Sequence, residues 1–132
     1  MPDIDLKALL TSLYARREEA FIVPYEPRTM TSGPPTEHEF HNNVDRWVLE
    51  QPNHKSVRGW LVFDWTVVHQ FFPEIPLYRF TVHSVVEAPD GRLFDLTPSG
   101  ASQRYPFLRH HGLEGEFETI VLAGYTDLDF RA

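Results

Sequence analysis

Hydrophobic residues recur at helical spacing near the start of the chain. One face of a helix would carry Leu6, Leu9, Leu10, Leu13 and Tyr14. Asp3 or Asp5 is placed to cap the amino end. The pattern predicts a helix from Asp3 to about Arg17, with this stripe packed on the core.

A second helix is predicted after a proline-rich segment. The segment from Pro24 to Pro35 predicts an ordered or semi-extended loop, and long loops in compact domains are often functional. Thr36 and Glu39 have the spacing of a capping box, with Pro35 placed to pack against the first apolar residue of the helix. The apolar stripe of this helix consists of Phe40, Val44, Trp47 and Val48, and Pro52 ends it.

The rest of the chain changes to a strand pattern, rich in Val, Phe, Trp, Tyr, Thr and Ile. The predicted strands are Val57 to His69, Leu77 to Ala88, Arg92 to Thr97 and Glu116 to Ala123, with residues 98–115 irregular. Helices followed by consecutive strands indicate an α+β fold, with two N-terminal helices and then an antiparallel sheet of about four or five strands. The length of 132 residues suits a single domain, residues 1–132.

Charge and composition narrow the function classes. The net charge is −7 and no basic run is present, which argues against a nucleic-acid partner. The apolar runs are too short to span a membrane, and the acidic start with Asp3 and Asp5 lacks the features of a secretion signal. These features predict a cytoplasmic protein. The absence of cysteine excludes disulfides, thiolate ligands and a thiol nucleophile.

The turn between the second and third predicted strands decides which side chains share a face. A two-residue Asp-Gly loop would pair Pro89 with Arg92 and put His83 and Asp95 on opposite faces. A three-residue Pro-Asp-Gly loop suits the residues better, because proline favours the second position of a type I turn and glycine the left-handed position after it. That register makes Asp95 the diagonal same-face neighbour of His83, where a carboxylate could orient the imidazole.

The order of several short motifs resembles an uncharacterised family of small bacterial proteins. In this chain the motifs are Glu39-Phe40-His41-Asn42-Asn43-Val44, Gly59-Trp60, His83-Ser84-Val85, Pro89-Asp90-Gly91-Arg92-Leu93 and Asp95-Leu96-Thr97-Pro98. The family carries Glu-Cys-His-x-Asn-Val, Gly-Trp, His-x-Val and Gly-x-Leu-x-Asp-x-Thr-Pro in the same order. The match spans roughly residues 39–98.

This order is similar to that of papain-like cysteine hydrolases, in which a helix-borne cysteine precedes a strand histidine and an acid. The resemblance implies that His83 is the base and Asp95 its orienting partner, both as remnants of a catalytic site. Phe40 stands at the nucleophile position, and a phenyl ring cannot attack an acyl carbon. The leading hypothesis is therefore a non-catalytic binding or accessory protein, a pseudoenzyme, whose ligand is a small molecule or peptide.

The binding residues of this hypothesis are Phe40, His41, Asn43 and Trp60. His41 and Asn43 lie near the positive end of the second helix, where they could face an anion or a carbonyl oxygen. The alternatives are that both belong to a solvated helix flank and that Trp60 fills a pleat of the sheet instead of lining a cleft. His83 and Asp95 could likewise be a structural pair on neighbouring strands.

Three further alternatives remain open. His38, His41, His83 and Asp95 could form a zinc site, which would indicate a metal-dependent hydrolase. Ser32, Thr36 and Ser84 are the candidate replacements for the missing thiol, although no base is placed for them by spacing. His110 and His111 are expected on the surface of a loop. A structural or interaction protein with surface aromatics is the third possibility.

Overall fold

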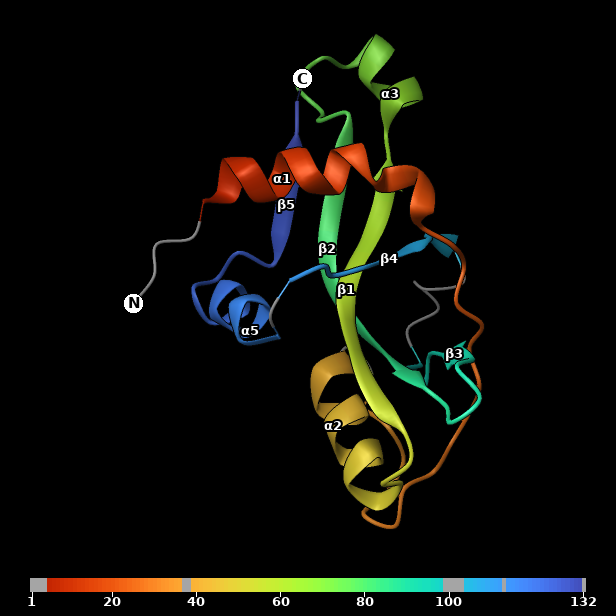
Figure 1. Ribbon diagram of the computed structural model, residues 1–132. Coiled ribbons are helices and arrows are strands. Elements are labelled where there is room, and N and C mark those ends of the chain that lie inside the picture. Colours follow the sequence, from red (N-terminus) through yellow and green to blue (C-terminus); the bar gives the residue numbers. More distant parts are fainter. Residues whose placement is uncertain (1–4, 37–38, 99–103, 113, 132) are drawn as a thin grey trace.

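The computed structural model describes residues 5–36, 39–98, 104–112 and 114–131, and these form an α+β structure (Figure 1). The helices are α1 (Leu6–Ala15), the short 3-10 helix η1 (Arg17–Glu19), α2 (Phe40–Glu50), α3 (Thr66–Phe71) and α5 (Glu114–Leu122). The strands are β1 (Lys55–Asp64), β2 (Tyr78–Glu87), β3 (Leu93–Phe94), β4 (Phe107–Arg109) and β5 (Asp127–Phe130). None of the described helices is long and apolar enough to span a membrane.

A long antiparallel pair, β1 with β2, forms the centre of the sheet. The strand order is β3-β2-β1-β4, and β5 also pairs with β2. β5 pairs with Tyr78–Thr81 and β3 with Val86–Glu87, so these two short strands share one edge of β2. The intervening residues of β2, which include His83, lie between them and next to the start of α2. The pairings between these named strands are antiparallel, as the sequence predicts.

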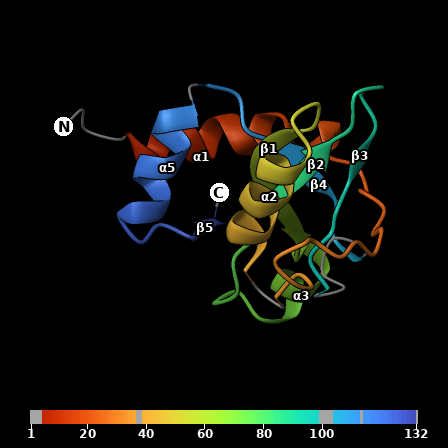
Figure 2. The same ribbon diagram turned by 90° about the horizontal axis from the view of Figure 1, so that it is seen from below.

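α1 and α5 lie on one face of the sheet. α1 runs across β5, β2 and β1, with the Asp5 carboxylate accepting a hydrogen bond from Ala8 N at 3.0 Å as its cap (Figure 1). α5 lies below the amino-terminal half of α1 (Figure 1, Figure 2). Both helices pack on one core cluster of buried residues, formed by Leu13, Trp60, Val62, Phe80, Val82, Leu108, Phe117, Ile120 and Leu128.

Both faces of the sheet are covered. α2 packs Val44 and Trp47 in a second cluster with Val86, Phe94 and Leu96, and Val86 points to the same face as Val82 of the first cluster. The opposite face carries the third cluster, which consists of Val23, Val57, Leu61, Val85 and Phe107. His83 and Val85 are separated by two positions on β2 and therefore point to the same face. The side chains on this face, including that of His83, are consequently buried. The sequence pattern alone did not decide whether His83 is buried.

The segment Pro24–Pro35 is ordered against the sheet at its start. Asp95 N donates to Pro24 O at 2.8 Å, and Glu26 N donates to Asp95 O at 2.9 Å. These two bonds form a short parallel bridge between Tyr25 and Asp95. The segment thereby fixes the backbone of Asp95, a residue of the expected site.

Several predictions from the sequence are wrong. The predicted strand Glu116 to Ala123 lies in helix α5 up to Leu122, and its buried residues, Phe117 and Ile120, are three positions apart and share a helical face. The predicted strand Val57 to His69 ends at Asp64, and α3 follows it. Two short strands, β4 and β5, were missed. Helix α1, the 3-10 helix η1 and helix α2 precede the strands, and α3 and α5 interrupt the strand series that was expected to be continuous.

Candidate functional site

The side chains of His83 and Asp95 are hydrogen-bonded, with 2.6 Å between Nε2 and Oδ2. The turn that brings them together has the three-residue form: Ala88 N donates to Arg92 O and Gly91 N to Ala88 O, each at 2.9 Å. Gly91 has a φ of +88°, the left-handed conformation that glycine adopts at little cost. The predicted register and the predicted contact are confirmed.

The His83–Asp95 pair is enclosed by protein. His83 is 1% exposed and Asp95 is 0% exposed. The other carboxylate oxygen of Asp95 accepts a hydrogen bond from Thr97 N at 2.9 Å. In this arrangement the pair holds β2 to the chain that follows β3, and His83 has almost no surface that a substrate could contact.

Phe40 packs its ring directly against His83. The two ring centroids are 4.9 Å apart, and the ring of His41 lies 4.7 Å from Phe40 on another side. Phe107 approaches His83 from β4, with a centroid distance of 6.4 Å. The position at which the resemblance expects a nucleophile therefore lies next to the histidine that would serve it.

Asn43 is fully buried and acts as a backbone clamp. Its Oδ1 accepts from Thr36 N at 2.9 Å, and its Nδ2 donates to Thr36 O at 2.7 Å and to Thr97 Oγ1 at 3.1 Å. Because both amide protons and the oxygen are used, Asn43 has no donor left for a bound carbonyl or anion. The predicted capping box is wrong: Glu39 is the N-cap of α2 without a side-chain cap, and Thr36 is held by Asn43.

Trp60 fills the sheet, as in the second of its two interpretations. It is fully buried in the main core cluster, and its ring lies 5.4 Å from that of Phe117. Its Nε1 has no hydrogen-bond partner in the described part of the chain. Trp60 therefore lines no cleft.

His41 belongs to a chain of polar contacts that the sequence did not indicate. Its Nδ1 contacts Oγ of Ser84, which is fully buried on β2. Arg58 donates from Nη1 to the same Oγ at 2.9 Å and from Nη2 to Asp45 Oδ1 at 2.7 Å. Burial, the charge of Arg58 and the nearby His83 lower the pKa of His41 to about 4, while Asp45 opposes the shift. The imidazole of His41 is therefore neutral near pH 7.

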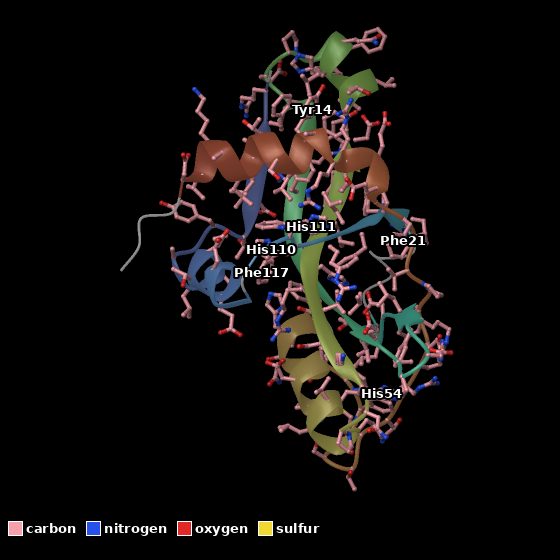
Figure 3. All side chains as sticks on the ribbon, in the orientation of Figure 1. Tyr14, Phe21, His54, His110, His111 and Phe117 are labelled. Carbon is pink, nitrogen blue, oxygen red and sulfur yellow. The ribbon has the colours of Figure 1, made fainter. Side chains whose placement is uncertain are left out.

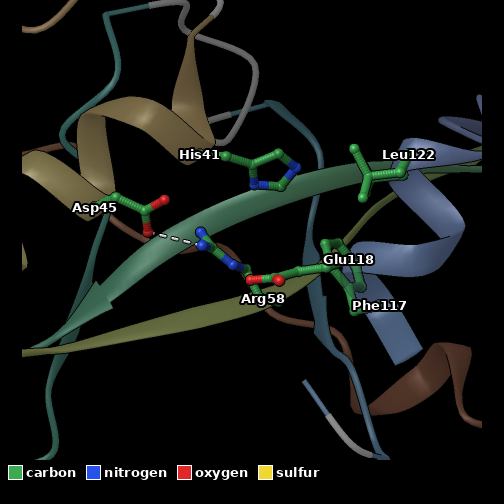
Figure 4. A pocket seen from close by; sticks show the side chains of 7 residues that line it. His41, Asp45, Arg58, Phe117, Glu118 and Leu122 are labelled. Carbon is green, nitrogen blue, oxygen red and sulfur yellow. Dashed lines mark hydrogen bonds and ion pairs between the residues drawn. The ribbon is translucent and has the colours of Figure 1, made fainter. Parts of the chain in front are cut away.

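A cavity of about 230 Å³ opens beside His41, between α2, β1 and α5 (Figure 4). Its walls are His41, Asp45, Arg58, Phe117, Glu118, Val121 and Leu122. The ring of His41 lies across the cavity from α5, with Arg58 below it in Figure 4. The cavity combines an apolar wall from α5 with polar groups from α2 and β1, the mixture that small-molecule sites usually have.

The expected zinc ligands are not gathered into one group. His38 lies outside the described residues. Among the described residues, no three His, Asp or Glu side chains come close enough to hold a metal ion. His41 contacts Ser84, the residue that directly follows His83 on β2. The side chains of Ser84 and His83 therefore point to opposite faces of the strand. The zinc site remains a prediction that the described residues do not support.

The structure also places the candidate hydroxyl nucleophiles and the two neighbouring histidines. Ser32 accepts hydrogen bonds from Arg46, and Thr36 is tied through its backbone to Asn43. His111 is exposed as expected, whereas His110 is half-buried with its ring 5.3 Å from Phe117 (Figure 3).

Sequence reasoning missed Arg58 and the whole α5 wall of the cavity. Arg58 could have been noticed as the charged residue inside an apolar strand, where burial of a cation requires a partner.

Comparison of the chain with protein-family models, with curated proteins and with solved structures gives no match.

Proposed function

We propose that this protein is a non-catalytic binding or accessory protein, built on a papain-like hydrolase order that lacks the nucleophile. The observation that carries the proposal is the contact series Phe40–His83–Asp95. The ring of Phe40 packs on His83, and Asp95 bonds the far nitrogen of the imidazole. Helix residue, strand histidine and acid thus follow one another in space in the order that the resemblance implies.

The protonation geometry agrees with this order. Asp95 occupies Nε2 of His83, so Nδ1 is the nitrogen that could exchange a proton with a nucleophile. The side chain at position 40 lies against the ring of His83. Phenylalanine has neither a lone pair nor a proton to exchange, and loss of a triad nucleophile removes orders of magnitude in rate. The ring instead excludes water from the buried pair.

Ser84 and His41 form a serine–histidine contact, and its environment does not suit catalysis. The hydroxyl of Ser84 is fully buried, so no substrate carbon can approach it. A histidine with a pKa of about 4 is a weak base, and it would take the serine proton poorly at neutral pH. This contact therefore belongs to the wall of the cavity in the proposed function.

The ligand of the proposed binding protein is a small molecule or peptide, and the cavity beside His41 is its candidate site. The net charge of −7 supports the expectation that nucleic acid is not a partner. The proposal includes the papain-like arrangement, which the resemblance implies, and a cytoplasmic location, which the sequence features predict.

The test is a turnover assay on purified protein with fluorogenic peptide, amide and ester substrates. We expect no turnover above that of a His83→Gln variant whose circular dichroism matches the wild type. Turnover that is lost in His83→Gln would overturn the proposal, because it would assign a catalytic role to the buried pair. A zinc determination on untagged protein belongs in the same experiment, since stoichiometric zinc would favour the metal-dependent alternative.

An interaction protein is the second candidate function. α3 and the residue after it expose four apolar side chains, Val67, Val68, Phe71 and Phe72. Clustered exposed apolar residues often mark protein contacts. Light scattering after size exclusion tests this candidate: a concentration-independent monomer mass would remove self-association as its basis.

A further inference from the structure

The segment that contains α5 is attached to the sheet by hydrogen bonds at its two ends. Before the helix, His110 N donates to Arg58 O at 2.9 Å, and after it Val82 N donates to Thr126 O at 3.0 Å. Between these attachment points, residues 115–125 make no hydrogen bond or ion pair to any other described part of the chain. This stretch is therefore held on the sheet by the packing of its side chains.

The backbone of α5 closes its carboxyl end with its own residues. Tyr125 N donates to Ile120 O at 3.2 Å and Gly124 N to Val121 O at 3.0 Å, the pair of bonds that defines a Schellman cap. Gly124 has a φ of +90°, and Gly112, on the other side of the helix, has a φ of +133°. Because the cap bonds lie within the segment, α5 can move relative to the sheet without breaking them.

Two side chains supply most of the packing between α5 and the sheet. Phe117 is 1% exposed and Ile120 is 0% exposed, and both belong to the main core cluster. The other residues of the helix whose side chains the structure describes are exposed or half-buried, and Leu122 is 88% exposed. The burial of Phe117 and Ile120 is therefore the main favourable contribution to the docked position of α5.

Two polar atoms that α5 helps to bury oppose this docking. Trp60 Nε1 and His41 Nε2 are inaccessible to solvent and have no hydrogen-bond partner among the described residues. Their rings pack edge-on against Phe117, with centroid distances of 5.4 and 5.7 Å, and such contacts are at most weak hydrogen bonds. A buried polar atom without a partner costs free energy, which is recovered when water reaches it. The docked helix thus gains from two apolar side chains and loses at two polar atoms, so its net stabilisation is small.

We propose that α5 is a lid that pivots at its two attachment points and controls access to the cavity between α2 and β1. The helix carries the apolar wall of that cavity, formed by Phe117, Val121 and Leu122 (Figure 4). When the lid opens, this wall leaves the cavity, and the rings of His41 and Trp60 become accessible. The inference rests on the proposed function only in taking the cavity as the binding site. Lids of this kind open by rotation at a few residues at the ends of an element.

The experiment measures hydrogen exchange at Trp60 Nε1–H by NMR in the ¹⁵N-labelled full-length protein, with Trp60→Phe to assign the signal. This atom is buried, so it exchanges only when the structure opens above it. The amide of Val62, which donates to Pro106 O at 2.9 Å from the central strand β1, reports unfolding of the sheet. We expect the opening constant at Trp60 to exceed that at Val62 by at least about tenfold. It should also depend more weakly on urea, because lid opening exposes less surface than unfolding.

Two matched variants, each lacking one buried methylene equivalent, assign the opening to the lid. Ile120→Val weakens the docking of α5 and should accelerate exchange at Trp60 by about two- to tenfold, the usual range for this deletion. Leu61→Val removes the same volume from the third cluster, on the opposite face of the sheet. It should accelerate exchange at Val62 and leave exchange at Trp60 unchanged. The urea dependence of the wild type tests the lid even where a variant fails to fold.

Two results would overturn the inference. One is an opening constant at Trp60 that equals that at Val62 and has the same urea dependence, because both atoms would then exchange through global unfolding. The other is an equal acceleration of Trp60 exchange by Leu61→Val and Ile120→Val. Neither result depends on turnover. Hydrolysis that requires His83 would refute the proposed function and leave the lid standing, whereas a closed α5 would remove the lid and leave the proposed function untouched.

Discussion

Asp95 holds His83 through a 2.6 Å hydrogen bond in a part of the protein that solvent does not reach. Replacing Asp95 with alanine would leave both His83 Nε2 and Thr97 N–H without a partner. Each buried polar group without a partner costs about 1–3 kcal/mol, so we expect Asp95→Ala to lower the free energy of unfolding by at least about 2 kcal/mol. Urea titration measures the change. Asp90→Ala, which removes an exposed carboxylate from the adjoining turn, is the control and should cost less than about 1 kcal/mol.

Asn43 is predicted to be a stability residue and no part of a ligand site. Asn43→Ala removes three hydrogen bonds at once, two to the backbone of Thr36 and one to Thr97. We expect a loss of about 2–4 kcal/mol in unfolding free energy from the unpaired buried groups. A loss below about 1 kcal/mol would contradict this role of Asn43.

Gly59 is predicted to tolerate no side chain. A Cβ atom at this position would lie 2.3 Å from Leu108 O and 2.5 Å from Phe107 Cζ, which is the close packing of β4 on β1. We expect Gly59→Ala to destabilise the fold by about 1–3 kcal/mol or more, because the strands must separate. Gly115→Ala is the matched control: the new methyl meets nothing within 4 Å, and the change should be neutral or slightly stabilising.

The pKa of His41 predicts a pH dependence of stability. The pKa is about 4 in the folded protein and about 6.5 in an unfolded chain. Between these values the unfolded state binds more protons, so the unfolding free energy falls as the pH decreases from about 6.5 to about 4. Below about 4 this group contributes no further change.

The wild type is compared with His41→Gln, whose side chain does not titrate. On going from pH 7 to pH 4.5, the unfolding free energy of the wild type should fall by more than that of the variant. A pH-independent difference would contradict the lowered pKa.

Local turn chemistry was enough to predict the His83–Asp95 contact. Pro89, Asp90 and Gly91 fix the loop length, and the loop length fixes which residues of the hairpin share a face. The helix that carries Phe40 and the antiparallel sheet were predictable for the same reason, since their periodicity is local.

The cavity was not predictable, because its walls come from three separate elements. The run around Ile120 and Val121 has the composition of a strand, and only packing against the sheet makes it a helix. The contact between His41 and Ser84 joins residues 43 positions apart and depends on how α2 docks. Asn43 was misjudged as a donor for the same reason, since its three partners are set by tertiary structure.

The proposed hydrolase-like arrangement places the side chain at position 40 against His83, where a nucleophile would lie. It is tested most directly by measuring the thiol pKa of a Phe40→Cys variant from the pH dependence of alkylation by iodoacetamide. The chain has no other cysteine, so the signal is unambiguous. Leu49→Cys, at an exposed position of α2, is the matched control and should react with a pKa near the ordinary value of about 8.5.

We predict that the thiol introduced by Phe40→Cys has a pKa at least about one unit below that of the control, because the adjacent ring of His83 can accept the thiol proton and stabilise the thiolate. The shift should disappear when His83→Gln is added. A folded Phe40→Cys protein whose thiol pKa equals or exceeds that of the control, with or without His83, would contradict the proposed hydrolase-like arrangement.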